Sequence, residues 1–153
     1  MLRKSRYLAM VVLILGVVSM AMGIAFIVQG QAKANFMKEA MRQEQITLGL
    51  DESAVARGEI VDSSGEAQVA GDTVREHRHG IAATYSELGR FDPTNTTHVT
   101  YMQALNLENY LYLAVASFGL TTVAIASGAF MIVTGIALGG TGVVLFQLAK
   151  RAS

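Results

Sequence analysis

The sequence predicts an all-α membrane protein, and three observations support this prediction. Two long apolar runs, residues 7–30 and 111–148, contain no Asp, Glu, Lys or Arg. All twelve acidic residues lie between these runs, in residues 31–108. The chain is 52% hydrophobic and 16% charged, with a mean hydropathy of +0.39, whereas soluble domains carry about a quarter charged residues. Much of the chain is therefore expected to face lipid.

The first run, residues 7–30, is the expected N-terminal transmembrane helix. Its 24 residues exceed the number, about 20, that crosses roughly 30 Å of bilayer hydrocarbon. A cleaved signal peptide is the alternative, because basic residues precede the run and Ala32-Lys33-Ala34 fits the pattern of a cleavage site. The apolar part of a signal peptide has only about 7–15 residues. The length therefore favours a permanent anchor.

Residues 31–108 form the expected polar domain. They hold seven Lys and Arg against the twelve acidic residues, which gives a net charge of −5. The five other basic residues lie in the tails, residues 1–6 and 149–153. Lys and Arg beside a membrane segment tend to stay in the cytoplasm. We therefore expect a plasma (inner) membrane protein with a cytoplasmic N-terminus and residues 31–108 outside, and an acidic domain does not suit nucleic acid.

Residues 109–148 leave the number of membrane crossings open. The 38 residues of the second apolar run would extend about 57 Å as one helix, nearly twice the hydrocarbon thickness of roughly 30 Å. A helical hairpin that turns near Ser127 and Gly128 would give three crossings in the whole chain, and one long kinked helix would give two. No polar turn residues mark a hairpin, but the length favours it.

The polar domain is expected to be mostly helical. Good helix formers in residues 31–45 extend the first helix out of the membrane as far as Gly49. Ser63 and Glu66 form a capping-box pattern, in which each side chain satisfies a backbone N–H group of the other residue. This pattern predicts a helix over about residues 65–79.

A second capping pattern, at Thr100 and Gln103, predicts that the last helix begins near His98. Residues 55–61 could form a short strand, but the sequence offers no partner strand. Asn95-Thr96-Thr97 fits the acceptor pattern for N-glycosylation.

Small residues recur every seven positions in both apolar runs. Such a repeat places small side chains along one side of a helix, where helix backbones can approach closely. Glycine is also common in membrane helices in general, so chance is the alternative. We expect these glycines to pack helices, either within one chain or between copies. The candidates for helix packing are Gly16, Gly23, Gly30, Gly128, Gly135 and Gly142.

One cluster contains possible metal ligands: Glu76, His77 and His79, with His98 further along the chain. Glu76 and His79 share a helix face, but four-helix di-metal sites require such a pair twice. His77 and His79 would point about 200° apart on a helix, so both cannot bind one ion there. An exposed basic helix end, where Arg78 and His79 complement the helix dipole, is the simpler interpretation.

The sequence contains no recognisable catalytic or phosphate-binding motif, so we expect neither an enzyme nor a cofactor. The apolar runs lack Asp, Glu, Lys, Arg and His, which disfavours transport. The leading hypothesis is a non-enzymatic accessory or assembly subunit that binds a membrane-protein partner or forms a homo-oligomer. The alternative is an extracytoplasmic sensor that uses the histidines to respond to pH or metal.

Overall fold

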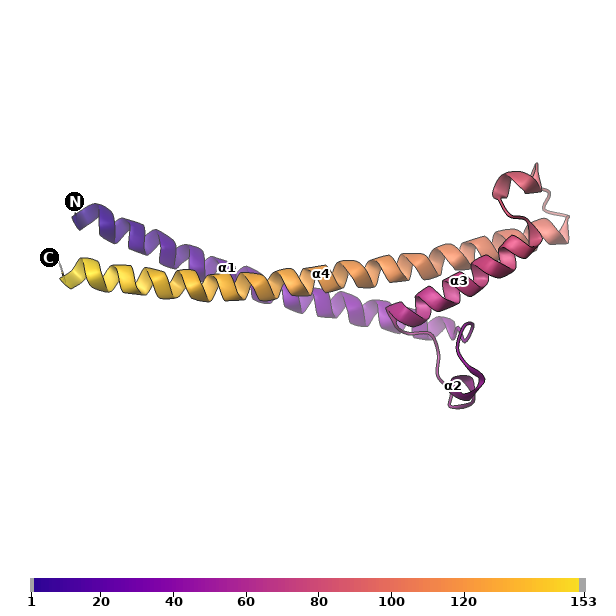
Figure 1. Ribbon diagram of the computed structural model, residues 1–153, viewed down its shortest axis with the longest axis horizontal. Helices are drawn as coiled ribbons and strands as arrows, with labels where there is room; N and C mark the ends of the chain where they lie inside the picture. The colour runs from indigo at the N-terminus through magenta and orange to yellow at the C-terminus, as the bar shows by residue number, and fades with distance from the viewer. Residues whose placement is uncertain (1, 152–153) are drawn as a thin grey trace. The chain divides into compact units, whose positions relative to one another are not determined.

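The computed structural model describes residues 2–151, and the side chains of residues 6–151. This part of the chain is helical and contains no strand, which confirms the predicted all-α class. Two of the helices, α1 and α4, are long and apolar enough to cross a membrane. The elements are α1 (Leu2–Glu44), α2 (Glu52–Ala56), α3 (Ser64–Ile81), the 3-10 helix η1 (Tyr85–Leu88) and α4 (Thr96–Arg151) (Figure 1).

The second apolar run lies in one helix, which corrects the expected hairpin. α4 continues for 56 residues, and no turn interrupts it near Ser127 and Gly128. The single proline of the chain, Pro93, precedes this helix, so no proline interrupts the backbone hydrogen bonds in the interior of α4. The alternative prediction of one long helix describes this segment.

The chain divides into two compact units, and both long helices contribute to each. The first unit contains α1 up to Lys33 and α4 from Thr121 onward. Within it the two helices run antiparallel, so that the beginning of α1 and the end of α4 lie at the same end of the unit (Figure 1). The second unit is Ala34–Leu120.

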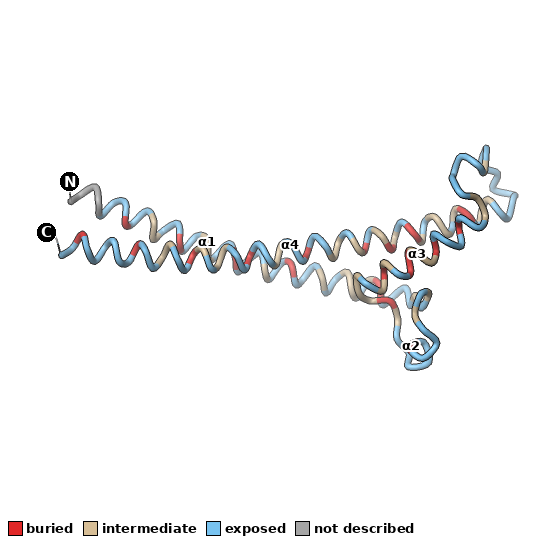
Figure 2. The backbone as a smooth tube through the Cα atoms, viewed as in Figure 1, coloured by how far each residue is buried: buried red, intermediate tan, exposed pale blue. Residues whose placement is uncertain are grey.

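The second unit has a small apolar core. Side chains of α1, α3 and α4 meet in it, together with Val61 from the segment between α2 and α3. Buried positions appear singly along the helices in Figure 2, as expected for helices that each bury one side. The buried members of the core are Met41, Val61, Ala67, Ala70, Val74, Leu111 and Ala114.

The first helix ends earlier than the sequence suggested. α1 extends beyond the apolar run, as predicted, but it stops at Glu44 rather than near Gly49. Gln45 follows with a φ of 51°, a left-handed conformation that ends the helix. Gly49 also has a positive φ, 83°, and lies in the turn that follows.

The capping box predicted for α3 is present. The backbone N–H of Glu66 donates to Ser63 Oγ at 3.3 Å, and the Ser63 N–H donates to Glu66 Oε2 at 3.1 Å. The helix then runs two residues beyond its predicted end, to Ile81. The possible strand at residues 55–61 was wrong, because these residues begin in α2 and continue through a turn.

The last helix begins at Thr96, two residues before its predicted start at His98. The pattern at Thr100 and Gln103 lies inside α4 and caps nothing. Asn95 has the capping role instead, since its Oδ1 accepts a hydrogen bond from the backbone N–H of Thr97 at 3.0 Å.

Candidate functional site

The backbones of α1 and α4 are in direct contact at Gly23 and Gly128. A Cβ atom added to Gly23 would lie 2.6 Å from the carbonyl oxygen of Gly128, and one added to Gly128 would lie 2.6 Å from the oxygen of Gly23. These distances are far below ordinary van der Waals contact. A side chain at either position would therefore push the two helices apart.

The contact continues toward the chain ends in the same way. A Cβ atom at Gly16 would lie 2.6 Å from the backbone nitrogen of Gly139, and one at Gly135 would lie 2.7 Å from the oxygen of Gly16. At Gly142 the nearest atom would be the backbone nitrogen of Leu13, at 2.9 Å. Glycine thus allows backbone contact over several turns of both helices.

At the other end of the paired segment the packing is slightly looser. A Cβ atom at Gly30 would lie 2.7 Å from a side-chain carbon of Ile125 and 3.2 Å from the backbone oxygen of Thr121. Between the contacts made by Gly16 and Gly23, the hydroxyl of Ser19 donates a hydrogen bond to the Met131 carbonyl at 2.8 Å. All six glycines named as packing candidates therefore face the other long helix of the same chain.

The outer surfaces of this helix pair are apolar. Leu8 of α1 is 62% exposed and Phe130 of α4 is 72% exposed. Only 11% of the most apolar stretch of each helix is buried. A helix that is apolar on all sides is typical of a membrane span or of the core of a large protein. Other exposed apolar residues of the pair include Val11, Leu15, Ile24, Val28, Val123, Val133, Ile136 and Leu148.

Arg78 is buried between α3 and α4, which corrects its interpretation as part of an exposed helix end. It is 8% exposed, and its Nε donates to Glu108 Oε2 at 2.6 Å. Its Nη1 donates to the hydroxyl of Tyr101, a residue with no exposed surface. The hydrogen bond to Glu108 raises the pKa of Arg78 above its ordinary value, so the guanidinium remains charged.

This cluster joins two helices but offers no reactive group. The guanidinium carbon of Arg78 lies 5.0 Å from the centre of the Tyr101 ring, so a cation–π contact accompanies the ion pair. No buried polar side-chain atom of the described residues is left without a hydrogen bond. Glu108 therefore serves as the counter-ion of Arg78, and the cluster is best explained as a structural link.

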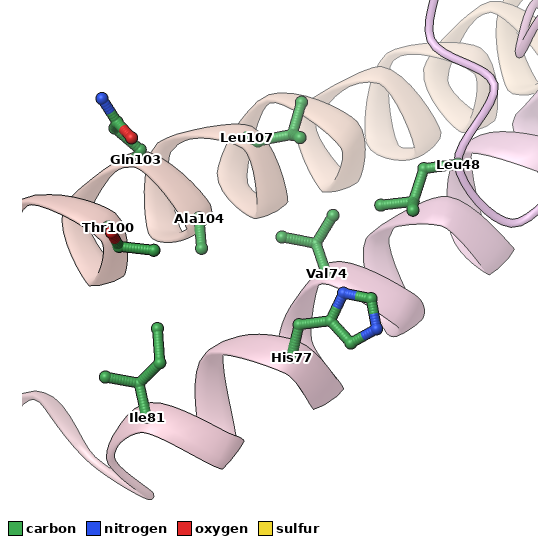
Figure 3. Close-up of a pocket in the computed structure, with 8 residues that line it drawn as sticks. All are labelled: Leu48, Val74, His77, Ile81, Thr100, Gln103, Ala104 and Leu107. Carbon is green, nitrogen blue, oxygen red and sulfur yellow. The ribbon is translucent and has the colours of Figure 1, made fainter. Parts of the chain in front are cut away.

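A groove of ≈ 320 Å³ lies between α3 and α4. In Figure 3, Val74 and Ile81 of α3 lie opposite Ala104 and Leu107 of α4, and the imidazole of His77 lies at the edge. The lining is largely apolar, with no nucleophile beside a base. Leu48, Thr100 and Gln103 complete it.

The structure does not assemble the possible metal ligands. His79 Nε2 lies 3.1 Å from Arg78 Nη2, and His98 Nδ1 accepts a hydrogen bond from the backbone N–H of Asp92 at 3.0 Å. In residues 2–151 no group of three or more His, Cys, Asp or Glu side chains is placed to hold a metal ion. The candidate ligands were Glu76, His77, His79 and His98.

Sequence reasoning missed the Arg78 cluster, although a signal for it existed. Arg78 follows Val74 by four residues, and Val74 follows Ala67 by seven and Ala70 by four, so all of them lie on one helical stripe. An arginine that continues an apolar stripe is a candidate for burial with a partner.

Comparisons of the chain with protein-family models, with curated proteins and with solved structures found no match. The function is therefore inferred from the geometry of the chain itself. The features that bear on it are the glycine contact between α1 and α4, the apolar exterior of that pair and the acidic surface of the second unit.

Proposed function

We propose that the protein is a small, non-enzymatic integral membrane protein that acts as an accessory or assembly subunit. In this proposal the α1–α4 pair anchors it in the bilayer, and the second unit binds a partner outside the cytoplasm. The observation that carries the proposal is the combination of a glycine-lined backbone contact inside the pair with an apolar exterior around it. Helices that share lipid as a solvent pack in this manner.

The glycine contact also narrows where a partner can bind. The six glycines are already occupied by contacts within one chain. A second copy or another protein would therefore bind through a different surface. The second unit is the better candidate, because it carries the polar and charged groups that give an interface its specificity.

The charges of the second unit favour a partner with a basic surface. Four acidic residues form ion pairs with Lys or Arg. Four others help to cap helices or turns by accepting backbone N–H groups. The carboxylates that have neither kind of contact among the described residues lie on α1, α2 and α3, and would be available to a basic partner. They are Glu39, Glu44, Glu52 and Glu76.

The proposal is tested by the size of the particle extracted from native membranes in a mild detergent. We expect a complex larger than the 16.3 kDa chain, measured by light scattering and by chemical crosslinking in the membrane before extraction. The double variant Glu52→Lys with Glu76→Lys should reduce the yield of the complex, because each change reverses a charge on the acidic surface.

A control adds positive charge away from this surface. Ser153→Lys adds positive charge to the basic C-terminal tail and should leave the complex intact. A lone 16.3 kDa monomer in every detergent and with every crosslinker would contradict the proposed role.

A further inference from the structure

The segment before α4 carries an Asn-x-Thr triplet on an exposed turn. The chain has four Asn residues, and Asn95 alone is followed two positions later by Ser or Thr. Every residue from position 91 to position 97 is exposed. A bulky group on Asn95 would therefore meet solvent rather than the core of the second unit.

The turn holds the Asn95 side chain with its amide nitrogen unengaged. The Asn95 backbone N–H donates to the Asp92 carbonyl at 3.2 Å, and Asn95 Oδ1 accepts from the Thr97 N–H at 3.0 Å. Among the described residues, neither Asn95 Nδ2 nor the Thr97 hydroxyl has a hydrogen-bond partner. These two groups are the ones that the acceptor triplet presents to a glycosyltransferase.

We propose that Asn95 is the acceptor of an N-linked glycan. This inference rests on the proposed orientation, in which the second unit lies outside the cytoplasm. The position at the start of α4 suits the reaction, because the first N–H groups of a helix have no partner within the helix. Thr96 and Thr97 can therefore open into an extended acceptor without breaking the rest of α4.

The transfer needs a co-reactant, a membrane lipid that carries an oligosaccharide through a phosphate or diphosphate. Nδ2 of Asn95 forms a bond to C1 of the first sugar. The bond between C1 and the phosphate oxygen breaks, and the lipid phosphate leaves with the bonding electron pair. Nδ2 gives up one proton to a base of the transferase, and no oxidation or reduction takes place.

The first test is the intact mass of the full chain purified from its native membranes. We expect a mass above that of the polypeptide by one glycan. Asn95→Gln and Thr97→Ala should each abolish the increase, the second without changing the acceptor residue. Thr97→Ser should retain it, because the triplet pattern accepts either hydroxyl. An unmodified mass for the native protein would overturn the inference.

The second test separates this inference from the proposed orientation. The chain is expressed in eukaryotic cells that glycosylate in the lumen of the endoplasmic reticulum. A variant carries a new triplet around Gly58, made by Arg57→Asn and Glu59→Thr, which removes both partners of an exposed ion pair together. A second variant adds Asn95→Gln to these changes, so that the two sites can be counted separately.

Glycans at both sites would support the inference and the orientation. A glycan around Gly58 without one at Asn95 would overturn the inference and leave the orientation standing. Absence of glycan from both sites would overturn both, because the second unit would then face the cytoplasm. Digestion with an endoglycosidase that releases N-linked glycans checks that any shift in mass is a glycan.

Discussion

At the residue scale, the strongest constraint is the buried ion pair between α3 and α4. The side chains of Arg78 and Glu108 are each 9% exposed. Removing one member of a buried pair costs about 3–5 kcal/mol, because the other charge remains without a partner. We predict that Glu108→Gln lowers the free energy of unfolding by an amount near that range, measured by thermal or denaturant unfolding in detergent.

Two comparisons test this prediction. Glu59→Gln breaks the exposed ion pair with Arg57 and should cost less than about 1 kcal/mol. The double change Arg78→Met and Glu108→Leu removes both charges and should recover much of the loss, as apolar replacements of buried pairs often do. The explanation fails if Glu108→Gln is no more harmful than Glu59→Gln.

A second residue-scale prediction concerns Asp72 and acid. The hydroxyl of Tyr112 donates to Asp72 Oδ1 at 2.7 Å, and this bond, with a further one from Gln68, holds the pKa of Asp72 below its ordinary value of 3.8. A lowered pKa in the fold stabilises it at pH values above 3.8, and that stabilisation is lost as the pH falls through the folded-state pKa.

We therefore expect Tyr112→Phe to be less stable than the natural chain at pH 7, with the difference shrinking as the pH falls below about 3.8. Chemical unfolding of both proteins across this range would measure it. Tyr85→Phe is the control, because it makes the same chemical change at a tyrosine that is 53% exposed, and it should show no such pH dependence. A constant difference at all pH values would contradict the assignment to Asp72.

Single residues also show where sequence reasoning succeeds and fails. The roles of Ser63 and Glu66 were predictable, because a capping box depends on residues three positions apart. The role of Arg78 was not predicted, because its partners Tyr101 and Glu108 lie more than twenty positions away. Nothing local in the sequence states which distant helix an arginine will meet.

At the element scale, the contact between α1 and α4 depends on glycine at defined positions. We predict that Gly23→Leu weakens the pair, because its Cβ would lie 2.6 Å from the Gly128 carbonyl oxygen and the helices must separate. Overpacking of this kind costs about 1–3 kcal/mol. Spin labels at Leu8 and Leu148, both exposed, would report a longer or broader distance distribution in lipid discs.

Gly140→Leu is the matched control. It lies in the partner helix α4 and makes the same chemical change, but a Cβ atom there meets nothing within 4 Å. Both variants gain the same intrinsic helix propensity, so a difference between them isolates the helix contact. Equal distance distributions in the two variants would show that the glycine contact does not hold the pair together.

The structure of α4 shows why the length of the second apolar run favoured a hairpin. That prediction assumed that lipid surrounds all of residues 111–148. In the structure Leu111 and Ala114 are buried in the core of the second unit, whereas the residues from Thr121 onward pair with α1. Hydropathy alone cannot distinguish a protein interior from a bilayer, because both are apolar surroundings.

At the scale of the whole molecule, the number of helices that can cross a membrane sets the location of the tails. The described residues contain two such helices, α1 and α4. If each crosses once, the two basic tails lie on the same side of the membrane. That arrangement agrees with the tendency of Lys and Arg to remain in the cytoplasm. Three crossings would instead place the basic C-terminal tail outside the cytoplasm.

The last prediction tests this arrangement with cysteine labelling, for which the chain is suited because it contains no cysteine. In intact cells, a membrane-impermeant maleimide should label Glu52→Cys, whose side chain is exposed in the second unit. It should label Ser153→Cys only after the membrane is permeabilised. Labelling of Ser153→Cys in intact cells, with Glu52→Cys also labelled, would contradict two crossings and leave either one crossing or the three crossings of the hairpin. Labelling of Ser153→Cys alone would invert the orientation, and would then also remove the basis for a glycan on Asn95.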